Sequence, residues 1–279
     1  MIAYDFEYFR PASVGEAVRL YRQAEARGQS PLYYAGGSEI ISMARLEQLR
    51  TGAVIDIKAI PDCCVMEFRG DRLVIGAAVP LIAVEEHPLF PLLADTTRDV
   101  ADHTNRNRIT VGGNLCGKFY YREVLLPFLL VDGEAVLAGP GGTRTVPVAD
   151  ILNGEPRLAP GELLVQVISD RRYFGLPYVT VKKTKMERID YPVVRIAALK
   201  TGEGIRIAFS GVSDIPFRSA RLEAILNDAS LPMEDRIDRA IAEWPAPILS
   251  DILASGAYRT FVLRNTLRDT MAELERRGI

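Results

Sequence analysis

The sequence is poor in the residues that bind metals and form disulfides. Its 279 residues include only three cysteines and two histidines. An odd number of cysteines, with Cys63 and Cys64 adjacent, cannot form a disulfide framework, and the chain has no CxxC pair of the kind that ligates zinc. We therefore expect reduced thiols and no metal site in this chain.

An excess of charge and long apolar runs are also absent. The 34 Lys and Arg residues are balanced by 36 Asp and Glu residues, so a formal net charge of −2 gives no reason to expect a nucleic-acid partner. The longest apolar run, residues 124–131, is about half as long as a membrane-spanning helix and contains Pro127. The first residues lack the apolar core of a signal peptide. These absences lead us to expect a cytoplasmic protein with no membrane span.

The spacing of apolar residues predicts an α+β chain. An S-x-x-E capping box, Ser13 with Glu16, begins a helix over residues 13–27, and Ser38 is expected to cap a brief helix. The last third of the chain predicts a three-stranded sheet with helices on one side. The other expected elements are strands at 31–35, 53–58, 178–182, 193–199 and 205–212, hairpins at 65–75 and 134–148, and helices at 81–86, 92–102, 219–226, 235–242 and 258–276.

Two pairs of adjacent glycines follow runs that we interpret as strand-like. They are Gly36-Gly37 after residues 31–35 and Gly112-Gly113 after residues 105–111. Without Cβ atoms, such residues allow several backbone N–H groups to turn toward one anion, so two facing pairs could hold a pyrophosphate. For each pair alone, a simple tight turn is the alternative. No G-x-G-x-x-G follows a strand, which disfavours a Rossmann site.

Two further patterns leave alternatives open. Residues 112–118 match G-x-x-x-x-G-K, but Phe119 stands where a P-loop requires Ser or Thr to hold Mg²⁺. A basic segment could be a solvated strand edge, or could contain one lysine that reaches an anionic cofactor. Its residues are Lys182, Lys183, Lys185 and Arg188.

Taken together, these motifs resemble a known family. Residues 35–39 and 110–114, with Lys182 eight residues before Asp190, resemble the FAD-binding subunit of molybdenum hydroxylases, which include xanthine dehydrogenases and the medium subunit of carbon monoxide dehydrogenase. The resemblance extends to Ser210-Gly211-Val212 and Tyr258-Arg259. It implies a two-lobed FAD-binding domain of the vanillyl-alcohol-oxidase (PCMH) type over residues 1–172, with lobes of about 1–58 and 59–172. A smaller C-terminal α/β domain would occupy residues 173–279.

The resemblance also implies a set of cofactor-binding residues. Backbone N–H groups of the first glycine segment and the Ser38 hydroxyl would wrap the FAD pyrophosphate, and the second segment would complete the cradle. Lys182 would lie near the flavin, and Glu123 would replace the family's acid on the ribose. The set is Ala35, Gly36, Gly37, Ser38, Glu39, Ile40, Thr110, Gly112, Gly113, Asn114, Glu123 and Lys182.

The implied function is an electron relay without substrate chemistry of its own. FAD would receive electrons from 2Fe-2S clusters on one partner subunit and pass them to an external acceptor, NAD being one candidate. Substrate would be hydroxylated at a molybdopterin on another partner. The alternatives are a P-loop-like protein that binds Mg-nucleotide and a scaffold subunit of the same complex without a cofactor.

Overall fold

The computed structural model describes residues 2–119, 121–151, 158–187 and 189–277. The chain forms two compact units that are interleaved along the sequence. Unit 1 comprises Met1–His87, Asp102–Lys118 and Gly133–Asp170, and unit 2 comprises Pro88–Ala101, Phe119–Asp132 and Arg171–Ile279. Residues 88–101 and 119–132 lie inside the range expected for the first domain, yet they cluster with the C-terminal part of the chain.

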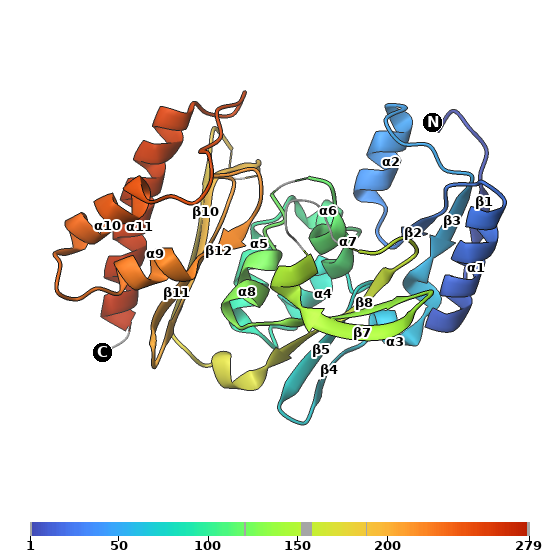
Figure 1. Ribbon diagram of the computed structural model, residues 1–279, viewed down its shortest axis with the longest axis horizontal. Helices are drawn as coiled ribbons and strands as arrows, with labels where there is room; N and C mark the ends of the chain where they lie inside the picture. Colours follow the sequence, from blue (N-terminus) through green and yellow to red (C-terminus); the bar gives the residue numbers. More distant parts are fainter. Residues whose placement is uncertain (1, 120, 152–157, 188, 278–279) are drawn as a thin grey trace. The chain divides into compact units, whose positions relative to one another are not determined.

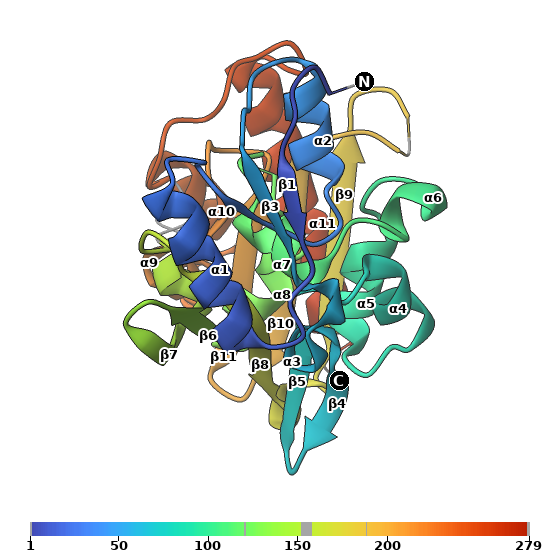
Figure 2. The ribbon, with the colours of Figure 1, turned by 90° about the vertical axis from the view of Figure 1, so that its right-hand side faces the viewer.

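Unit 1 contains a small parallel sheet with strand order β1-β3-β2. Parallel pairing requires crossover connections, and helices α1 and α2 supply them while flanking the sheet (Figures 1 and 2). As expected, the Ser13 hydroxyl accepts the N–H of Glu16 at 3.2 Å and begins α1. The bounds are β1 Glu7–Phe9, α1 Val14–Ala26, β2 Leu32–Tyr34, α2 Ser38–Arg45 and β3 Ala53–Asp56.

The second sheet of unit 1 is antiparallel, with strand order β4-β5-β8-β6-β7. Both expected hairpins are present, whereas its central strand β8 was not predicted. The bounds are η1 Ile57–Ala59, α3 Pro61–Cys64, β4 Met66–Arg69, β5 Arg72–Gly76, α4 Leu81–Glu86, α6 His103–Arg106, α7 Val111–Cys116, β6 Glu134–Gly139, β7 Gly142–Pro147, η2 Val148–Ile151 and β8 Leu163–Asp170.

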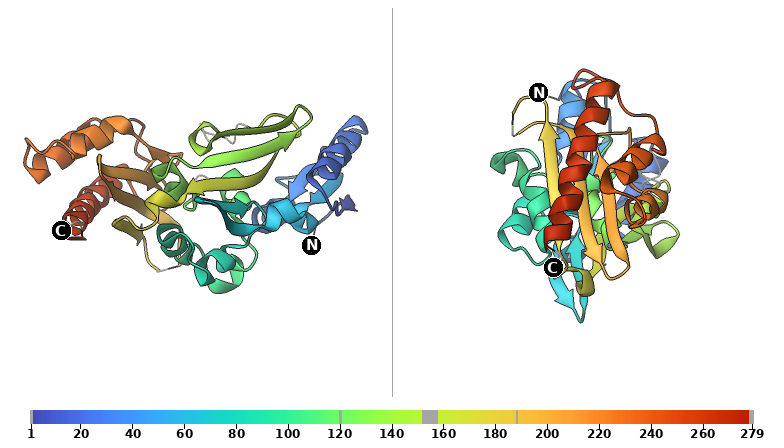
Figure 3. Two further views of the ribbon diagram at one scale, coloured as in Figure 1. Left: turned by 90° about the horizontal axis from the view of Figure 1, so that it is seen from below. Right: turned by 90° about the vertical axis from the view of Figure 1, so that its left-hand side faces the viewer.

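Unit 2 is built on an antiparallel sheet with strand order β12-β11-β10-β9. The three expected strands are β9, β10 and β11, and the two-residue β12 adds a fourth. Helices α9, α10 and α11 close one hydrophobic core, with α11 packed on the face of the sheet against β9 and β10 (Figure 3, right). The bounds are α5 Pro91–Arg98, α8 Leu125–Leu130, η3 Arg171–Tyr173, β9 Tyr178–Thr184, β10 Pro192–Thr201, β11 Gly204–Ser210, β12 Phe217–Arg218, α9 Ala220–Leu226, α10 Met233–Ala242 and α11 Gly256–Arg277.

Strand β10 is buried on both faces. Residues 192–199 are all buried, and Ile196 and Ala198 belong to the core that α9–α11 complete. Helix α8 also packs against β10 and β11, and α5 packs against β9. These mixed sheets and helices confirm the predicted α+β class. Within the described part of the chain, no helix is both long and apolar enough to cross a bilayer.

Candidate functional site

The first glycine pair lies between β2 and α2, in a space that excludes larger side chains. A Cβ atom on Gly36 would lie 1.7 Å from the carbonyl oxygen of Arg108. Gly37 has a φ of +73° and packs on the ring of Tyr34, where a Cβ atom would lie 2.2 Å from the nearest ring carbon. Glycine is therefore required at both positions, at Gly36 by close approach and at Gly37 also by a left-handed backbone.

Helix α2 begins without a side-chain cap. Its N-cap is Gly37, so the N–H groups of Ser38, Glu39 and Ile40 in its first turn have no carbonyl acceptor within the helix. The prediction that Ser38 caps this helix is wrong, because Ser38 is its first helical residue. Within the described part of the chain, the Ser38 Oγ atom is buried and has no hydrogen-bond partner. The N–H groups at a helix N-terminus attract anions, and together with the buried Ser38 hydroxyl this makes the start of α2 the strongest candidate for a phosphate site.

The second glycine pair is not a loop after a strand, and that prediction is wrong. Residues 105–111 include part of α6, and Gly112-Gly113 lie in the first turn of α7, where the Thr110 side chain caps the Gly113 N–H at 3.1 Å. The N–H groups of Gly112 and Asn114 also donate within the unit, to Ala77 and Thr110 carbonyl oxygens. Gly112 is buried against Ala77, and this close packing overrides the turn preference of paired glycines.

The same geometry removes the support for a P-loop. A P-loop wraps free backbone N–H groups around phosphate before its helix begins, whereas residues 111–116 are already helical here. The N–H of Lys118 is taken by Glu39 Oε1 at 2.7 Å. Glu39 also packs closely on Gly117: a Cβ atom added to Gly117 would lie 2.8 Å from Glu39 Oε2. Glu39 therefore links the first turn of α2 to the end of α7 and brings the two glycine segments together.

A cluster of polar residues behind the first glycine pair was missed by sequence reasoning. Lys58 Nζ donates to the Ala35 carbonyl oxygen at 2.9 Å and to Asp56 Oδ2 at 2.7 Å. Tyr8 donates its hydroxyl proton to the same carboxylate oxygen at 2.5 Å. Burial raises the pKa of Asp56, but the hydrogen bonds from Lys58 and Tyr8 outweigh it and hold the pKa below its ordinary value.

The remaining candidates, Glu123 and Lys182, lie in unit 2 and bind each other. Lys182 Nζ donates to Glu123 Oε1 at 2.9 Å and to the Asp99 carbonyl oxygen at 2.8 Å. Arg195, fully buried on β10, bonds Asp99 Oδ2 at 2.8 Å, and its Nε atom lies 3.5 Å from Glu123 Oε2. Lys182 is therefore a buried residue of a charge cluster, not part of a solvated edge. Arg188 of the basic segment lies outside the described residues.

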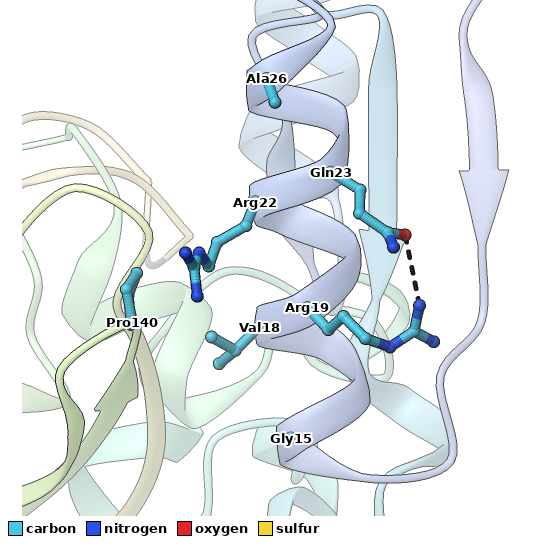
Figure 4. Close-up of a pocket in the computed structure, with 7 residues that line it drawn as sticks. All are labelled: Gly15, Val18, Arg19, Arg22, Gln23, Ala26 and Pro140. Carbon is cyan, nitrogen blue, oxygen red and sulfur yellow. Dashed lines mark hydrogen bonds between the residues drawn. The ribbon is translucent and has the colours of Figure 1, made fainter.

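A surface groove of unit 1 is separate from the glycine segments. It measures about 430 Å³ and lies between α1 and the tip of the β6–β7 hairpin at Pro140 (Figure 4). Arg19 and Arg22 line it, and Arg19 is bonded to Gln23 on the same helix. Both arginines are exposed, and the residues that line the groove include neither the glycine pair nor the buried Ser38 hydroxyl of the α2 N-terminus.

Comparison with known proteins gives the family. Residues 4–168, more than half of the chain, match the family model described as FAD binding domain in molybdopterin dehydrogenase. The chain belongs to this family. The FAD-binding domain therefore includes both glycine segments, the first turn of α2 and the Lys58 cluster, and FAD is its cofactor.

Relatives of the family extend the similarity beyond residue 168. The medium chain of carbon monoxide dehydrogenase from Hydrogenophaga pseudoflava is 30% identical over 229 residues, which is 78% of each chain. The medium chain of glyceraldehyde dehydrogenase from Sulfolobus acidocaldarius is 26% identical over 93% of this chain and 95% of its own. A solved structure of the Hydrogenophaga carbon monoxide dehydrogenase, in a form lacking the Mo-pyranopterin moiety, aligns with a TM-score of 0.89, 27% identity and 99% coverage of both chains.

The residues of unit 1 fit a bound FAD. Among the described residues, the buried Ser38 hydroxyl has no partner, and α2 begins without a side-chain cap beside a glycine pair that brings the backbone close. A pyrophosphate can accept all of these hydrogen bonds and carries the charge that a helix N-terminus favours. Thr110 and the amides of residues 112–114 are already bonded within the unit, and the bond from Lys118 to Glu39 links the end of α7 to the start of α2.

Proposed function

We propose that this chain is the electron-transfer flavoprotein subunit of a molybdenum-containing hydroxylase or dehydrogenase complex. The observation that carries the proposal is the uncapped N-terminus of α2, with its glycine pair and its buried Ser38 hydroxyl, in a chain of the FAD-binding family. Residues 35–40 hold the pyrophosphate, with Thr110, Gly112, Gly113 and Asn114 packed beside them. Lys182 and Glu123 remain candidates for contacts to the flavin and the ribose.

When bound, FAD supplies a carrier that takes up electrons and passes them to an acceptor. The chain's own residues bind and orient this carrier, and none is proposed to act on an organic substrate. The chain has only three cysteines, Cys63, Cys64 and Cys116, fewer than the four that a 2Fe-2S cluster requires, so these clusters belong on a partner subunit. Molybdopterin belongs on a second partner, where a xanthine-dehydrogenase-like hydroxylation takes place. We propose the cytoplasm as the location and NAD as a candidate acceptor.

The site is tested by FAD binding to Ser38→Ala, with Ser42→Ala on the same helix as its matched control. Ser42 donates to the Ser38 carbonyl oxygen and is exposed, whereas the Ser38 hydroxyl is buried without a partner. We expect Ser38→Ala to weaken FAD binding about tenfold, without loss of stability, since removing an unsatisfied buried hydroxyl does not destabilise a protein. Fluorescence titration with FAD and thermal melts measure the two effects.

Wild-type protein that takes up no FAD, alone or with its partner subunits, would overturn the proposal and favour a scaffold. Equal FAD affinities for Ser38→Ala and Ser42→Ala would remove Ser38 from the site. Uptake of Mg-ATP in place of FAD would restore the nucleotide alternative.

A further inference from the structure

We propose that Lys58 is a positioning residue for the FAD pyrophosphate, because it fixes the direction of the peptide that enters the glycine pair. The inference rests on the proposed function and names a residue to which neither the sequence motifs nor the resemblance gave a role. Lys58 follows β3, and its ammonium group bonds the carbonyl oxygen of Ala35, the residue that precedes Gly36.

The geometry of the peptide bond connects this contact to the cofactor. In a planar trans peptide, the carbonyl oxygen of one residue and the N–H of the next point in opposite directions. With the Ala35 oxygen held on Lys58, the N–H of Gly36 is aimed away from Lys58. Gly36 cannot adjust by moving sideways, because the Arg108 carbonyl oxygen lies against its Cα hydrogen position. One hydrogen bond therefore sets the direction of a donor assigned to the pyrophosphate.

Lys58 is itself held from two other sides. Its Nζ atom bonds Asp56 Oδ2, and the buried Asp56 carboxylate is fixed in turn by the Tyr8 hydroxyl. The same ammonium lies 4.4 Å from the centroid of the Tyr34 ring, at a distance where a cation is attracted to the ring face. The Tyr34 ring also packs against Gly37. Lys58 thus contacts Ala35 and Tyr34, the two residues that precede the glycine pair, and reaches Gly37 only through the Tyr34 ring.

The charge of Lys58 is balanced by Asp56. Lys58 therefore contributes by orienting the Ala35–Gly36 peptide more than by attracting the phosphate charge. This distinguishes it from a lysine that binds phosphate directly, whose effect would fall steeply with added salt. Lys58→Met removes the bond to Ala35, and Lys58→Arg keeps a cation and donors that can replace it. Arg19→Met is the matched control, since it removes one exposed cation from α1 in the same unit.

The test combines FAD titration of the full chain at low and high salt with hydrogen exchange over residues 34–40 in the FAD-free protein. For Lys58→Met, we expect FAD binding to weaken about tenfold at both salt concentrations and exchange of the Gly36 segment to speed up. Lys58→Arg should keep most of the FAD affinity and most of the slow exchange. Arg19→Met should change neither the FAD affinity nor the exchange rate. Thermal melts show whether each variant is folded.

The outcomes separate the two proposals. Faster exchange in Lys58→Met, in a chain that binds no FAD at all, would overturn the proposed function while showing that Lys58 still orders residues 34–40. Wild-type exchange and wild-type FAD affinity in a folded Lys58→Met protein would overturn the positioning role. A loss of affinity that disappears at high salt would also overturn it, since Lys58 would then act by charge alone.

Discussion

At the scale of the residue, the site of unit 1 depends on polar groups that are nearly all satisfied by the protein. The Asp56 carboxylate accepts from Tyr8, from the Lys58 side chain and from the Lys58 backbone N–H. The buried hydroxyl of Ser38 differs, because it has no partner among the residues that the structure describes. A buried donor without an acceptor costs free energy, so its presence indicates a site that is completed by a ligand.

The titration of Asp56 leads to a prediction for stability at acid pH. Its folded-state pKa is held below the ordinary value by Lys58 and Tyr8, so its contribution is present above the unfolded-state pKa and is lost as pH falls through the folded-state pKa. We expect the melting temperature of wild type to fall between about pH 4 and pH 2, and that of Asp56→Asn to fall less steeply. Melts across this pH range, with Glu67→Gln as the exposed control, measure the difference. Parallel curves for all three proteins would contradict the prediction.

At the scale of the element, the sequence predicted those helices and strands that depend on contacts between residues close together in the chain. The capping box of α1 and the two hairpins depend on residues a few positions apart, and they were predicted. The helix α7 was not, because the packing of Gly112 on Ala77 is a contact 35 residues away that no local pattern reveals. Strand β8 is buried along most of its length, and a continuous apolar run lacks the alternation that identifies a half-buried strand.

In the candidate site, too, the sequence predicted the local features and missed the long-range contacts. Gly36-Gly37 lie between a strand and a helix as predicted, while their binding of a pyrophosphate stays a prediction. Lys58 and Arg195 carry no sequence signal, because the contacts that give them a place, to Ala35 and Asp99, are 23 and 96 positions away. The resemblance had also pointed to Arg259 and Gly211 without a role. In the structure, Arg259 is fully buried on α11 and donates to the carbonyl oxygens of Val193 in β10 and of Gly211, which directly follows β11.

The charge cluster of unit 2 predicts a large effect of one conservative change. Glu123→Gln keeps the shape of the side chain but removes its negative charge. The buried Lys182 then has no counter-charge from Glu123, and Arg195 is left with its ion pair to Asp99. Breaking a buried pair in this way costs roughly 3–5 kcal/mol, and we expect about 3 kcal/mol of lost unfolding free energy, measured with urea. Glu67→Gln, whose pair with Arg69 is about half exposed, should cost less than about 1 kcal/mol. Similar losses for both variants would show that the buried cluster contributes little.

At the scale of the whole molecule, the chain crosses between the units after residues 87, 101, 118, 132 and 170. Unit 2 therefore takes its α5 and α8 helices from the middle of the sequence, and Arg195 takes its partners from the same two segments. Neither unit corresponds to one continuous stretch of chain.

This interleaving predicts how fragments behave. A fragment of residues 171–279 keeps the sheet and α9–α11 but loses the residues that cover Arg195 on β10. We expect it to be poorly packed, with collapsed amide dispersion in its NMR spectrum and strong binding of a hydrophobic dye. Adding the complementary fragment, residues 1–170, should restore dispersion if the two associate. A well-dispersed spectrum of the short fragment alone would contradict the expectation.

The five crossings also bear on inheritance. A single recombination event between the genes of two relatives, wherever it falls between residues 88 and 170, assigns some strands and helices of one hydrophobic core to each parent. A crossover after residue 123, for example, would take Glu123 and Lys182 from different lineages, and the two side chains would have to match by chance. Such hybrids are selected against, so the two units are expected to have been inherited together and to share one phylogenetic tree.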